Sequence, residues 1–220
     1  MTDFTWMIWT QMTNFVKNFF MKTKIKIKAN LPVFSKTDAK GNTVFSDAKG
    51  NEILSYNPKG DLYDLYAAED VELKGPKSSI RTWTEKESGQ QKITVNNSVV
   101  FESAIFSLGI AVKLPDGYMS EVHPRSSTFG QKKIMLTNSE GQIDHSYMGN
   151  NDIWKFGAVA FEDTKISKGD KIAQFRIHLS QHASIWQKIK WLFSNKIELE
   201  FVDELEGENR GGFGSTGGYK

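Results

Sequence analysis

Residues 141–150 place one carboxylate, Asp144, and one phenol, Tyr147, three positions apart between glycines. This spacing suits a hairpin turn, whose peptide edges can pair with the hydrogen-bonding edge of a base. An aspartate can take a proton from a water molecule, and a tyrosine ring can press against a sugar. The simpler alternative is a polar turn in which Asp144 caps its own backbone, a common role for aspartate.

A second turn, at residues 124–130, combines Arg125 with the small hydroxyl side chains of Ser126 and Ser127. A guanidinium fork, hydroxyl groups and the free amides of a tight turn are groups that bind phosphate oxygens. Arginine and serine are also ordinary turn residues, so a structural salt bridge from Arg125 explains the pattern equally well.

The tail at residues 209–220 contains five glycines, one arginine, one phenylalanine and a Ser-Thr pair. Glycine loses the most backbone entropy on ordering, so this segment needs a ligand to hold it in place. Arg210 suits phosphate oxygens, and Phe213 suits a flat base. The composition therefore predicts a lid over a nucleotide with a polyphosphate, with a disordered tail as the alternative.

Short strands are the elements that must position these groups. Residues 24–28 and 196–201 alternate apolar with charged side chains, the period of half-buried strands. Turn clusters at 57–60, 115–117 and 168–170 separate further short apolar runs. Those runs are 71–73, 105–114, 134–136, 158–161 and 172–177. The pattern predicts an all-β barrel or jelly-roll sandwich.

Two segments interrupt the strands. The stretch 77–97 is polar, which predicts an excursion from the body or a hairpin. Residues 185–194 predict a short inserted helix, opened by a capping box of Ser184 and Gln187. Its apolar face, which includes Ile185 and Leu192, favours a contact with the chain's own body or a subunit over a membrane or nucleic-acid surface.

Bulk properties indicate one domain in a chain of 220 residues. A net charge of +2 gives no general field for nucleic acid, and the absence of cysteine excludes disulfides and thiolate chemistry. The apolar residues near the start are too few to span a bilayer. Their helical spacing predicts an accessory helix, or a product of upstream translation, at 1–20. The body is then 21–208, with inserts at 77–97 and 181–195, and the arm is 209–220.

Five blocks of the sequence resemble, in order, the motifs of the homotrimeric dUTP diphosphatases (dUTPases). They are residues 64–70 (DLYAAED), 124–127 (PRSS), 141–147 (GQIDHSY), 169–174 (GDKIAQ) and 210–217 (RGGFGSTG). The run 149–154 and the residues leading into Asp64 are most similar to variants from phages of Gram-positive bacteria.

The resemblance implies a jelly-roll subunit, a homotrimer with shared interfacial active sites, and an arm that reaches over a neighbour's site. It implies hydrolysis of dUTP to dUMP and pyrophosphate with Mg²⁺, which limits uracil in DNA and supplies dUMP for dTTP synthesis. It also implies a cytoplasmic location, in the host if the protein is phage-encoded. Neither nucleic acid nor a membrane is expected as a partner, whereas a repressor or inhibitor protein is a candidate.

By matching position, the resemblance assigns Asp144 to activating the attacking water and Tyr147 to backing the deoxyribose and rejecting a 2′-hydroxyl. Asp64 supports the magnesium ion through ordered water, and the triphosphate supplies the direct ligands. The other substrate-binding residues are Asn138, Gly141, Gln142 and Ile143 for uracil, Arg125, Ser126, Ser127 and Gln174 for phosphates, and Arg210, Phe213, Gly214, Ser215 and Thr216 from the arm.

Two other functions stay open from the sequence. A dCTP deaminase of the same fold also resembles residues 125–127, but its glutamate acid-base has no counterpart in residues 154–161. A non-catalytic phage regulator that binds a nucleotide or a protein is the other. The helix predicted between the last two blocks also leaves open which subunit's site the arm covers.

Overall fold

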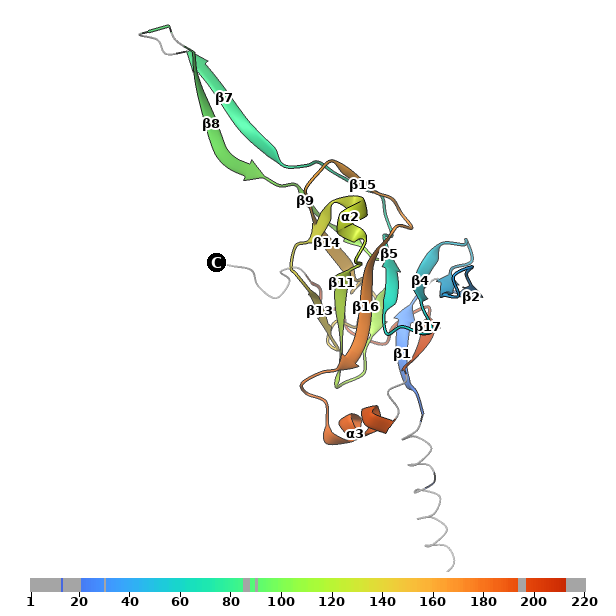
Figure 1. Cartoon of the computed structure of the whole chain (residues 1–220). Helices are drawn as coiled ribbons and strands as arrows, with labels where there is room; N and C mark the ends of the chain where they lie inside the picture. The colour runs from blue at the N-terminus through green and yellow to red at the C-terminus, as the bar shows by residue number, and fades with distance from the viewer. Residues whose placement is uncertain are drawn as a thin grey trace, which may run out of the picture.

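The computed structural model describes residues 13, 21–29, 31–84, 88–89, 91–193 and 197–212 (Figure 1). Apart from Thr13, the predicted extension at 1–20 lies outside these residues. So do four arm residues with predicted substrate contacts: Phe213, Gly214, Ser215 and Thr216. The roles suggested for those positions remain predictions.

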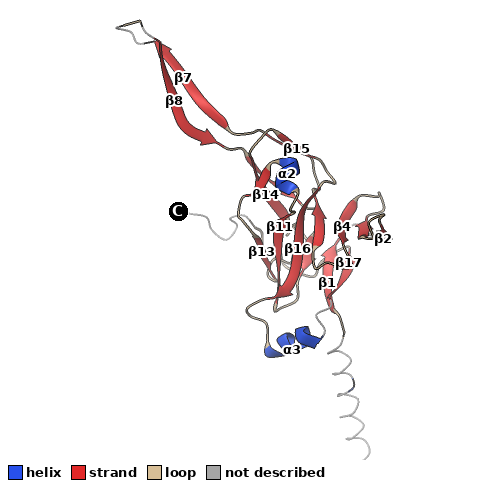
Figure 2. Cartoon of the chain, in the orientation of Figure 1, coloured by secondary structure: helices blue, strands red, loops and turns tan. Residues whose placement is uncertain are grey.

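Strands dominate the described chain, whose two helices, α2 (Thr128–Lys132) and α3 (Ile185–Phe193), are short (Figure 2). The largest sheet is antiparallel and has the strand order β13-β11-β16-β5-β4-β3-β2. Its strands are β2 (Phe34–Thr37), β3 (Thr43–Ser46), β4 (Glu52–Tyr56), β5 (Tyr63–Tyr66), β11 (Tyr118–Pro124), β13 (Gly141–Asp144) and β16 (Lys171–Leu179). The predicted all-β, jelly-roll class is confirmed.

Smaller sheets complete the body. In one of them β1 pairs antiparallel with β10 and parallel with β17. A second has the order β12-β14-β9, and a third joins β15 to β6. Their strands are β1 (Thr23–Lys28), β6 (Val71–Leu73), β9 (Ser103–Ser107), β10 (Ala111–Lys113), β12 (Ile134–Leu136), β14 (Lys155–Ala160), β15 (Thr164–Ile166) and β17 (Ile197–Val202).

The core follows from the alternation read in the sequence. Ile25 and Ile27 of β1 are buried, whereas the intervening lysines reach solvent. Trp154 is also buried and meets Phe175 edge-on, with 5.1 Å between ring centroids. Burying such a side chain stabilises the fold by roughly 1.5–3 kcal/mol. Trp154 therefore anchors the end of the loop that begins at Tyr147.

The polar stretch that begins at Lys77 forms a hairpin of β7 (Lys77–Thr84) and β8 (Gln91–Val100). The two strands pair from Lys77 opposite Val100 to Thr84 opposite Gln91. The hairpin projects from the body at the end opposite α3 (Figure 1).

Helix α3 begins with the predicted capping box. Gln187 N donates to Ser184 Oγ (3.3 Å), and Ser184 N donates to Gln187 Oε1 (2.7 Å). The side chain of Gln187 also donates to Asp116 O. One turn later, the Trp191 ring meets Tyr118 edge-on, with 5.9 Å between ring centroids. Neither described helix is long and apolar enough to cross a membrane.

The apolar face predicted for this helix does not pack on the described body of the chain. Ile185 is 65% exposed and Leu192 is 80% exposed. A contact of this face with a subunit stays a prediction; on the described body of the chain, Ile185 and Leu192 remain exposed. The reason is that the contacts of Gln187 and Trp191 select the opposite side of the helix for docking, and residues four apart share a side.

Candidate active site

A cavity of about 290 Å³ lies where β13 meets the start of the C-terminal arm. The fold of one chain brings seven predicted site residues to it: Asn138, Gly141, Gln142, Ile143, Asp144, Tyr147 and Arg210. Five further residues that were not predicted complete the lining: Val122, Leu136, Trp154, Lys155 and Gly212. The residues expected to read a base and to activate water therefore share one cavity.

Among the residues that the structure describes, β11 is the one strand that pairs with β13, which stands at an edge of the large sheet. The register runs from Met119 opposite Asp144 to Val122 opposite Gly141. A Cβ atom at Gly141 would lie 3.2 Å from Val122 Cβ, so glycine lets the strands approach closely here. An edge strand presents unpaired N–H and C=O groups, which can pair with the edge of a ligand.

Asp144 is held at the end of β13 by its own turn. Ser146 N and Ser146 Oγ donate to Asp144 Oδ1 at 2.9 and 2.6 Å, and Arg210 Nη1 lies 3.2 Å from the same oxygen. Burial opposes ionisation, but the Ser146 hydrogen bonds and the Arg210 charge outweigh it and hold the pKa of Asp144 below its usual value. The carboxylate therefore caps its own backbone, as the simpler alternative predicted, and is ionised at neutral pH, as a base requires.

Tyr147 lines the cavity with a half-buried ring. Its hydroxyl donates to Ile153 O at 3.0 Å, which fixes the orientation of the ring. Burial, with a smaller contribution from the Asp152 charge, raises the pKa of Tyr147, so the phenol stays neutral. The ring is thus a rigid, uncharged wall of the cavity.

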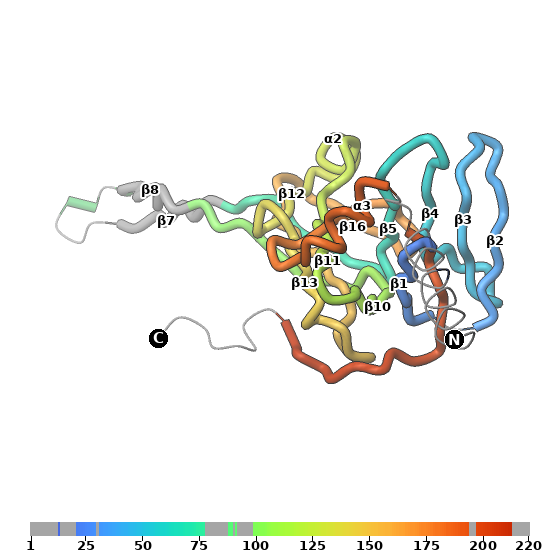
Figure 3. Tube along the Cα trace, turned by 90° about the horizontal axis from the view of Figure 1, so that it is seen from below, coloured from blue at the N-terminus to red at the C-terminus, as the bar shows by residue number. Residues whose placement is uncertain are grey.

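The described part of the arm lies against the pocket of its own chain. Figure 3 shows the last described residues running from β17 toward the side of β13. There the Arg210 guanidinium meets Asp144, and a Cβ atom at Gly212 would lie 3.4 Å from the Tyr147 ring. The resemblance implied a reach over a neighbour's site, but these residues begin beside the chain's own Asp144.

Three of the predicted phosphate and magnesium residues, Asp64, Arg125 and Gln174, line a second hollow, of about 660 Å³. Arg125 Nε lies 2.8 Å from Asp64 Oδ1, and Lys171 Nζ lies 3.6 Å from Asp64 Oδ2. Gln174 donates to Pro124 O at 3.5 Å. Ser126 and Ser127 form the turn that leads into α2. The structural salt bridge considered for Arg125 is therefore present, in a hollow where three carboxylates (Asp38, Asp61, Asp64) balance three cations (Lys40, Arg125, Lys171).

Asp144 and Arg125 lie near opposite ends of β11. Asp144 pairs with Met119, whereas Arg125 directly follows Pro124 at the other end of this strand. Six residues of extended chain span about 20 Å. Within one chain, Arg125 therefore lies too far from Asp144 for both to contact the same phosphate group.

No family model matches the chain. The chain is 40% identical over 159 residues to the SPbeta prophage-derived deoxyuridine 5′-triphosphate nucleotidohydrolase YosS of Bacillus subtilis (strain 168), covering 72% of this chain and 85% of that protein. It is 31% identical over 137 residues to the deoxyuridine 5′-triphosphate nucleotidohydrolase of Thermobifida fusca, covering 60% and 69%. The chain belongs to the dUTPase family. Among solved structures, a mutant dUTPase from phage phi11 of S. aureus, described with a structural Mg(II) ion, matches 70% of this chain and 94% of that one at 16% identity and a TM-score of 0.43.

One group of potential metal ligands occurs among the described residues of this dUTPase-family chain. Ligand atoms of Glu121, His123 and Glu140 lie within 4.8 Å of one another. However, Glu121 also accepts from Arg176 at 2.8 and 2.7 Å and lies 3.0 Å from His178 Nε2. The Arg176 guanidinium already neutralises the carboxylate that a metal ion would need.

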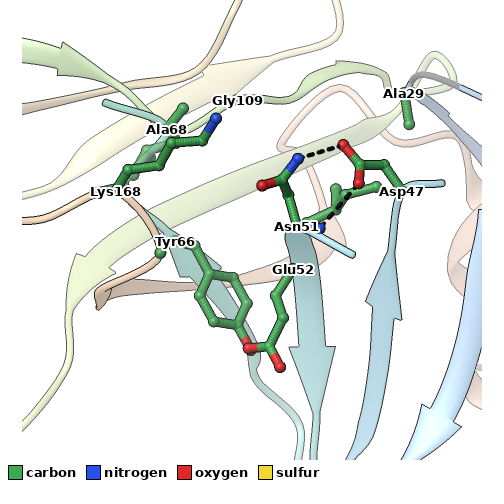
Figure 4. A pocket seen from close by; sticks show the side chains of 12 residues that line it. Ala29, Asp47, Asn51, Glu52, Tyr66, Ala68, Gly109 and Lys168 are labelled. Carbon is green, nitrogen blue, oxygen red and sulfur yellow. Dashed lines mark hydrogen bonds between the residues drawn. The ribbon is translucent and has the colours of Figure 1, made fainter. Parts of the chain in front are cut away.

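A third hollow, of about 360 Å³, contains none of the predicted site residues (Figure 4). In it, Asn51 N and Nδ2 donate to the Asp47 carboxylate at 2.9 and 2.8 Å, and Tyr66 donates to Ser55 at 2.9 Å. The Asn51 side-chain hydrogen bond is the main cause that lowers the pKa of Asp47. The Asp47 carboxylate therefore stabilises a turn.

The unpredicted lining residues had no distinct signal in the sequence. Val122 and Leu136 have the alternating apolar pattern of any core strand, and Trp154 belongs to the run 149–154, whose resemblance to phage variants did not indicate a contact with the cavity. Lys155 is one of many lysines at a strand end. A dUTPase-family motif marks residues that act on the ligand, whereas these residues shape the cavity around it.

Gly149→Ala is expected to displace the start of the arm. A Cβ atom there would lie 2.6 Å from Cα and 2.7 Å from N of Asn209, and backbone atoms cannot rotate away. We expect a loss of about 1–3 kcal/mol in unfolding free energy, typical of overpacking, together with reduced turnover. Gly130→Ala in α2 is the matched control, because a Cβ atom there meets nothing within 4 Å. Equal denaturation midpoints and equal turnover for the two variants would contradict this close approach.

Arg210→Gln is expected to change the pH dependence of kcat/KM. The Arg210 charge is one of the influences that lower the pKa of Asp144, so its removal raises that pKa. If Asp144 is the general base, it acts when ionised, so activity is lost as the pH falls through this pKa and the acid limb should move to higher pH. Arg176→Gln removes an arginine that pairs with Glu121 instead, and should leave the limb in place. A limb that does not move in Arg210→Gln would show that Arg210 leaves Asp144 unaffected.

Proposed function

We propose that the protein hydrolyses dUTP to dUMP and pyrophosphate, with Asp144 deprotonating the attacking water. The supporting observation is one cavity that unites an ionised Asp144, the Tyr147 ring and the open edge of β13. In the reaction, the water oxygen bonds to the α-phosphorus and its proton passes to Asp144. The bond from the α-phosphorus to the bridging oxygen breaks, and pyrophosphate leaves.

Selection of deoxyuridine follows from the same cavity. The edge of β13, with Asn138 beside it, offers backbone and amide groups in fixed positions for the uracil edge. The Tyr147 ring, fixed by its bond to Ile153 O, packs where a 2′-hydroxyl would stand and excludes ribonucleotides. We also propose that Phe213 stacks on uracil from the far side, with Gly214, Ser215 and Thr216 closing over the phosphates.

In a homotrimer with shared sites, the cavity of Asp144 in one subunit and the residues around Arg125 in another would form one active site. One chain holds Asp144 and Arg125 at opposite ends of β11, so a phosphate next to Asp144 can contact Arg125 only if another chain supplies it. A neighbouring subunit that presents Arg125, Ser126, Ser127 and Gln174 to this cavity would supply the phosphate contacts. Three copies related by a threefold axis give three equivalent sites.

Magnesium is the cofactor we propose. The carboxylate of Asp64 has the hard oxygens that suit the water shell of Mg²⁺, but it already forms ion pairs with Arg125 and Lys171. These contacts fit a role through ordered water, with the triphosphate as direct ligand. When bound, the ion neutralises charge on the triphosphate. Arg125 and Lys171 contribute to the same neutralisation from the protein side.

In the cell, this activity would lower dUTP, limit uracil incorporation into DNA and supply dUMP for dTTP synthesis. These substrates are soluble nucleotides, so we place the activity in the cytoplasm, in the host if the protein is phage-encoded. A repressor or inhibitor protein is a further candidate partner.

The deciding experiment incubates purified protein and Mg²⁺ with dUTP, UTP, dCTP and dTTP in parallel. We expect pyrophosphate from dUTP and about a hundredfold less from UTP, because the additional 2′-hydroxyl of UTP would clash with the Tyr147 ring. Ammonia from dCTP without pyrophosphate from dUTP would replace the proposal with a deaminase. No product from any nucleotide would favour a non-catalytic binding protein.

A further inference from the structure

Asp152 is a fully buried carboxylate that the proposed chemistry does not use. It lies in the loop between Tyr147 and β14, next to the cavity but outside its lining. An ionised carboxylate inside a protein is costly unless its oxygens accept hydrogen bonds. The partners of Asp152 therefore indicate what this residue is for.

Those partners come from two places in the chain. Asp152 Oδ2 accepts Gly149 N at 2.9 Å from its own loop. From the arm, Arg210 N lies 2.9 Å from Oδ2 and 3.1 Å from Oδ1, and Gly211 N donates to Oδ1 at 2.8 Å. Burial opposes ionisation, but these backbone N–H groups outweigh it and lower the pKa of Asp152. One charged side chain thus binds the loop and the arm together.

The residues around Asp152 extend the same contact. Asn150 Oδ1 accepts Leu205 N at 2.7 Å, and Asn150 Nδ2 donates to Leu205 O at 3.2 Å. Asn151 N donates to Asn209 Oδ1 at 2.7 Å. A Cβ atom at Gly207 would lie 2.6 Å from Met148 O, so this close approach requires glycine. We call residues 205–211 the arm root. They lie along the loop residues 148–152.

The position of the arm root determines where Arg210 acts. Asp152 holds the backbone N of Arg210, while the guanidinium of the same residue lies 3.2 Å from Asp144 Oδ1. Gly211 then turns with φ of 74°, a conformation that favours glycine, and the chain passes on to Gly212 beside Tyr147. If the arm root moved, Arg210 would leave the proposed base.

We propose that Asp152 is the positioning residue of the arm: it fixes the arm root so that Arg210 and the residues after it face the cavity of Asp144. This inference rests on the proposed function for its consequence in catalysis, but not for the structural contact. Asp152 does not touch the reacting atoms. It acts through the backbone of Arg210 and Gly211.

The test uses Asp152→Asn in the full-length protein. An amide keeps the size of the side chain but replaces one acceptor oxygen with a donor, which then faces backbone N–H groups. The matched control is Asp163→Asn, because Asp163 is also a loop aspartate that accepts a backbone N–H, from Gly75 at 2.8 Å, and it lies outside the site. Asn209→Ala is a milder second variant that removes only the contact with Asn151.

The first measurement is limited trypsin digestion after Arg210 without nucleotide, followed by the mass of the released peptide 211–220. We expect cleavage at least about tenfold faster in Asp152→Asn, a smaller increase in Asn209→Ala, and no change in Asp163→Asn, because local opening controls the rate. Unchanged cleavage in Asp152→Asn overturns the proposal. If that variant does not fold, unchanged cleavage in Asn209→Ala overturns it instead.

The second measurement is a double-mutant cycle with Arg210→Gln, read as kcat/KM for dUTP. If Asp152 acts through Arg210, the double variant should lose little more activity than Asp152→Asn alone. Losses that multiply would show a merely structural role and overturn the proposal. If the unmodified protein does not hydrolyse dUTP, the proposed function fails, but the digestion still decides the role of Asp152.

Discussion

Asp144→Asn is expected to bind dUTP and to hydrolyse it on the order of 10²- to 10⁴-fold more slowly, the range that general-base catalysis contributes. The amide has nearly the same shape and retains an oxygen for the bond from Ser146. It cannot take a proton from water. Pyrophosphate release measures kcat, and calorimetry with a non-hydrolysable dUTP analogue measures binding.

Asp116→Asn is the matched control for this variant. Asp116 is a nearby loop aspartate whose side chain is 96% exposed and lies 3.8 Å from His145. It should retain full turnover. Turnover that stays at the unmodified level in Asp144→Asn would exclude Asp144 as the base, and loss of nucleotide binding would assign it to binding instead.

Deletion of residues 210–220 is expected to leave a folded oligomer with at least about a hundredfold lower kcat/KM. This loss is comparable to the one caused by removing a single hydrogen-bond donor to the charge that develops in a transition state. The deletion removes Arg210 beside Asp144 but keeps β17 and the buried Leu205. Light scattering, a melting temperature and kcat/KM for dUTP test the three parts of this expectation.

A shorter deletion, of residues 213–220, separates the arm root from the residues beyond it. It keeps Arg210 and Gly211, which bind Asp152, and removes Phe213, Ser215 and Thr216. We expect an activity between those of the full chain and the longer deletion. Full activity in the longer deletion would show that the whole arm is dispensable, whereas unfolding would show that the arm root is part of the body.

The sequence by itself determined the features that depend on near neighbours in the chain. Asp144, Ser146 and Tyr147 form one turn, and their hydrogen bonds span two to six residues. The capping box at Ser184 and the alternation in β1 are equally local. Such patterns are readable because a few torsion angles and one side-chain period decide them. The all-β class and the dUTPase-family motifs follow from the same kind of signal.

Only the tertiary structure decided the features that depend on distant parts of the chain. Asp152 binds Arg210, 58 positions later, and Arg210 reaches back to Asp144 across 66 positions. The sheet order places Arg125 at the far end of β11 from Asp144, and the docking of Gln187 turns the apolar face of α3 outward. In the sequence, Asp152 stands between two asparagines and an isoleucine, and nothing in that pattern indicates that its side chain binds the arm. Its role comes from burial and from backbone donors that the folded chain supplies.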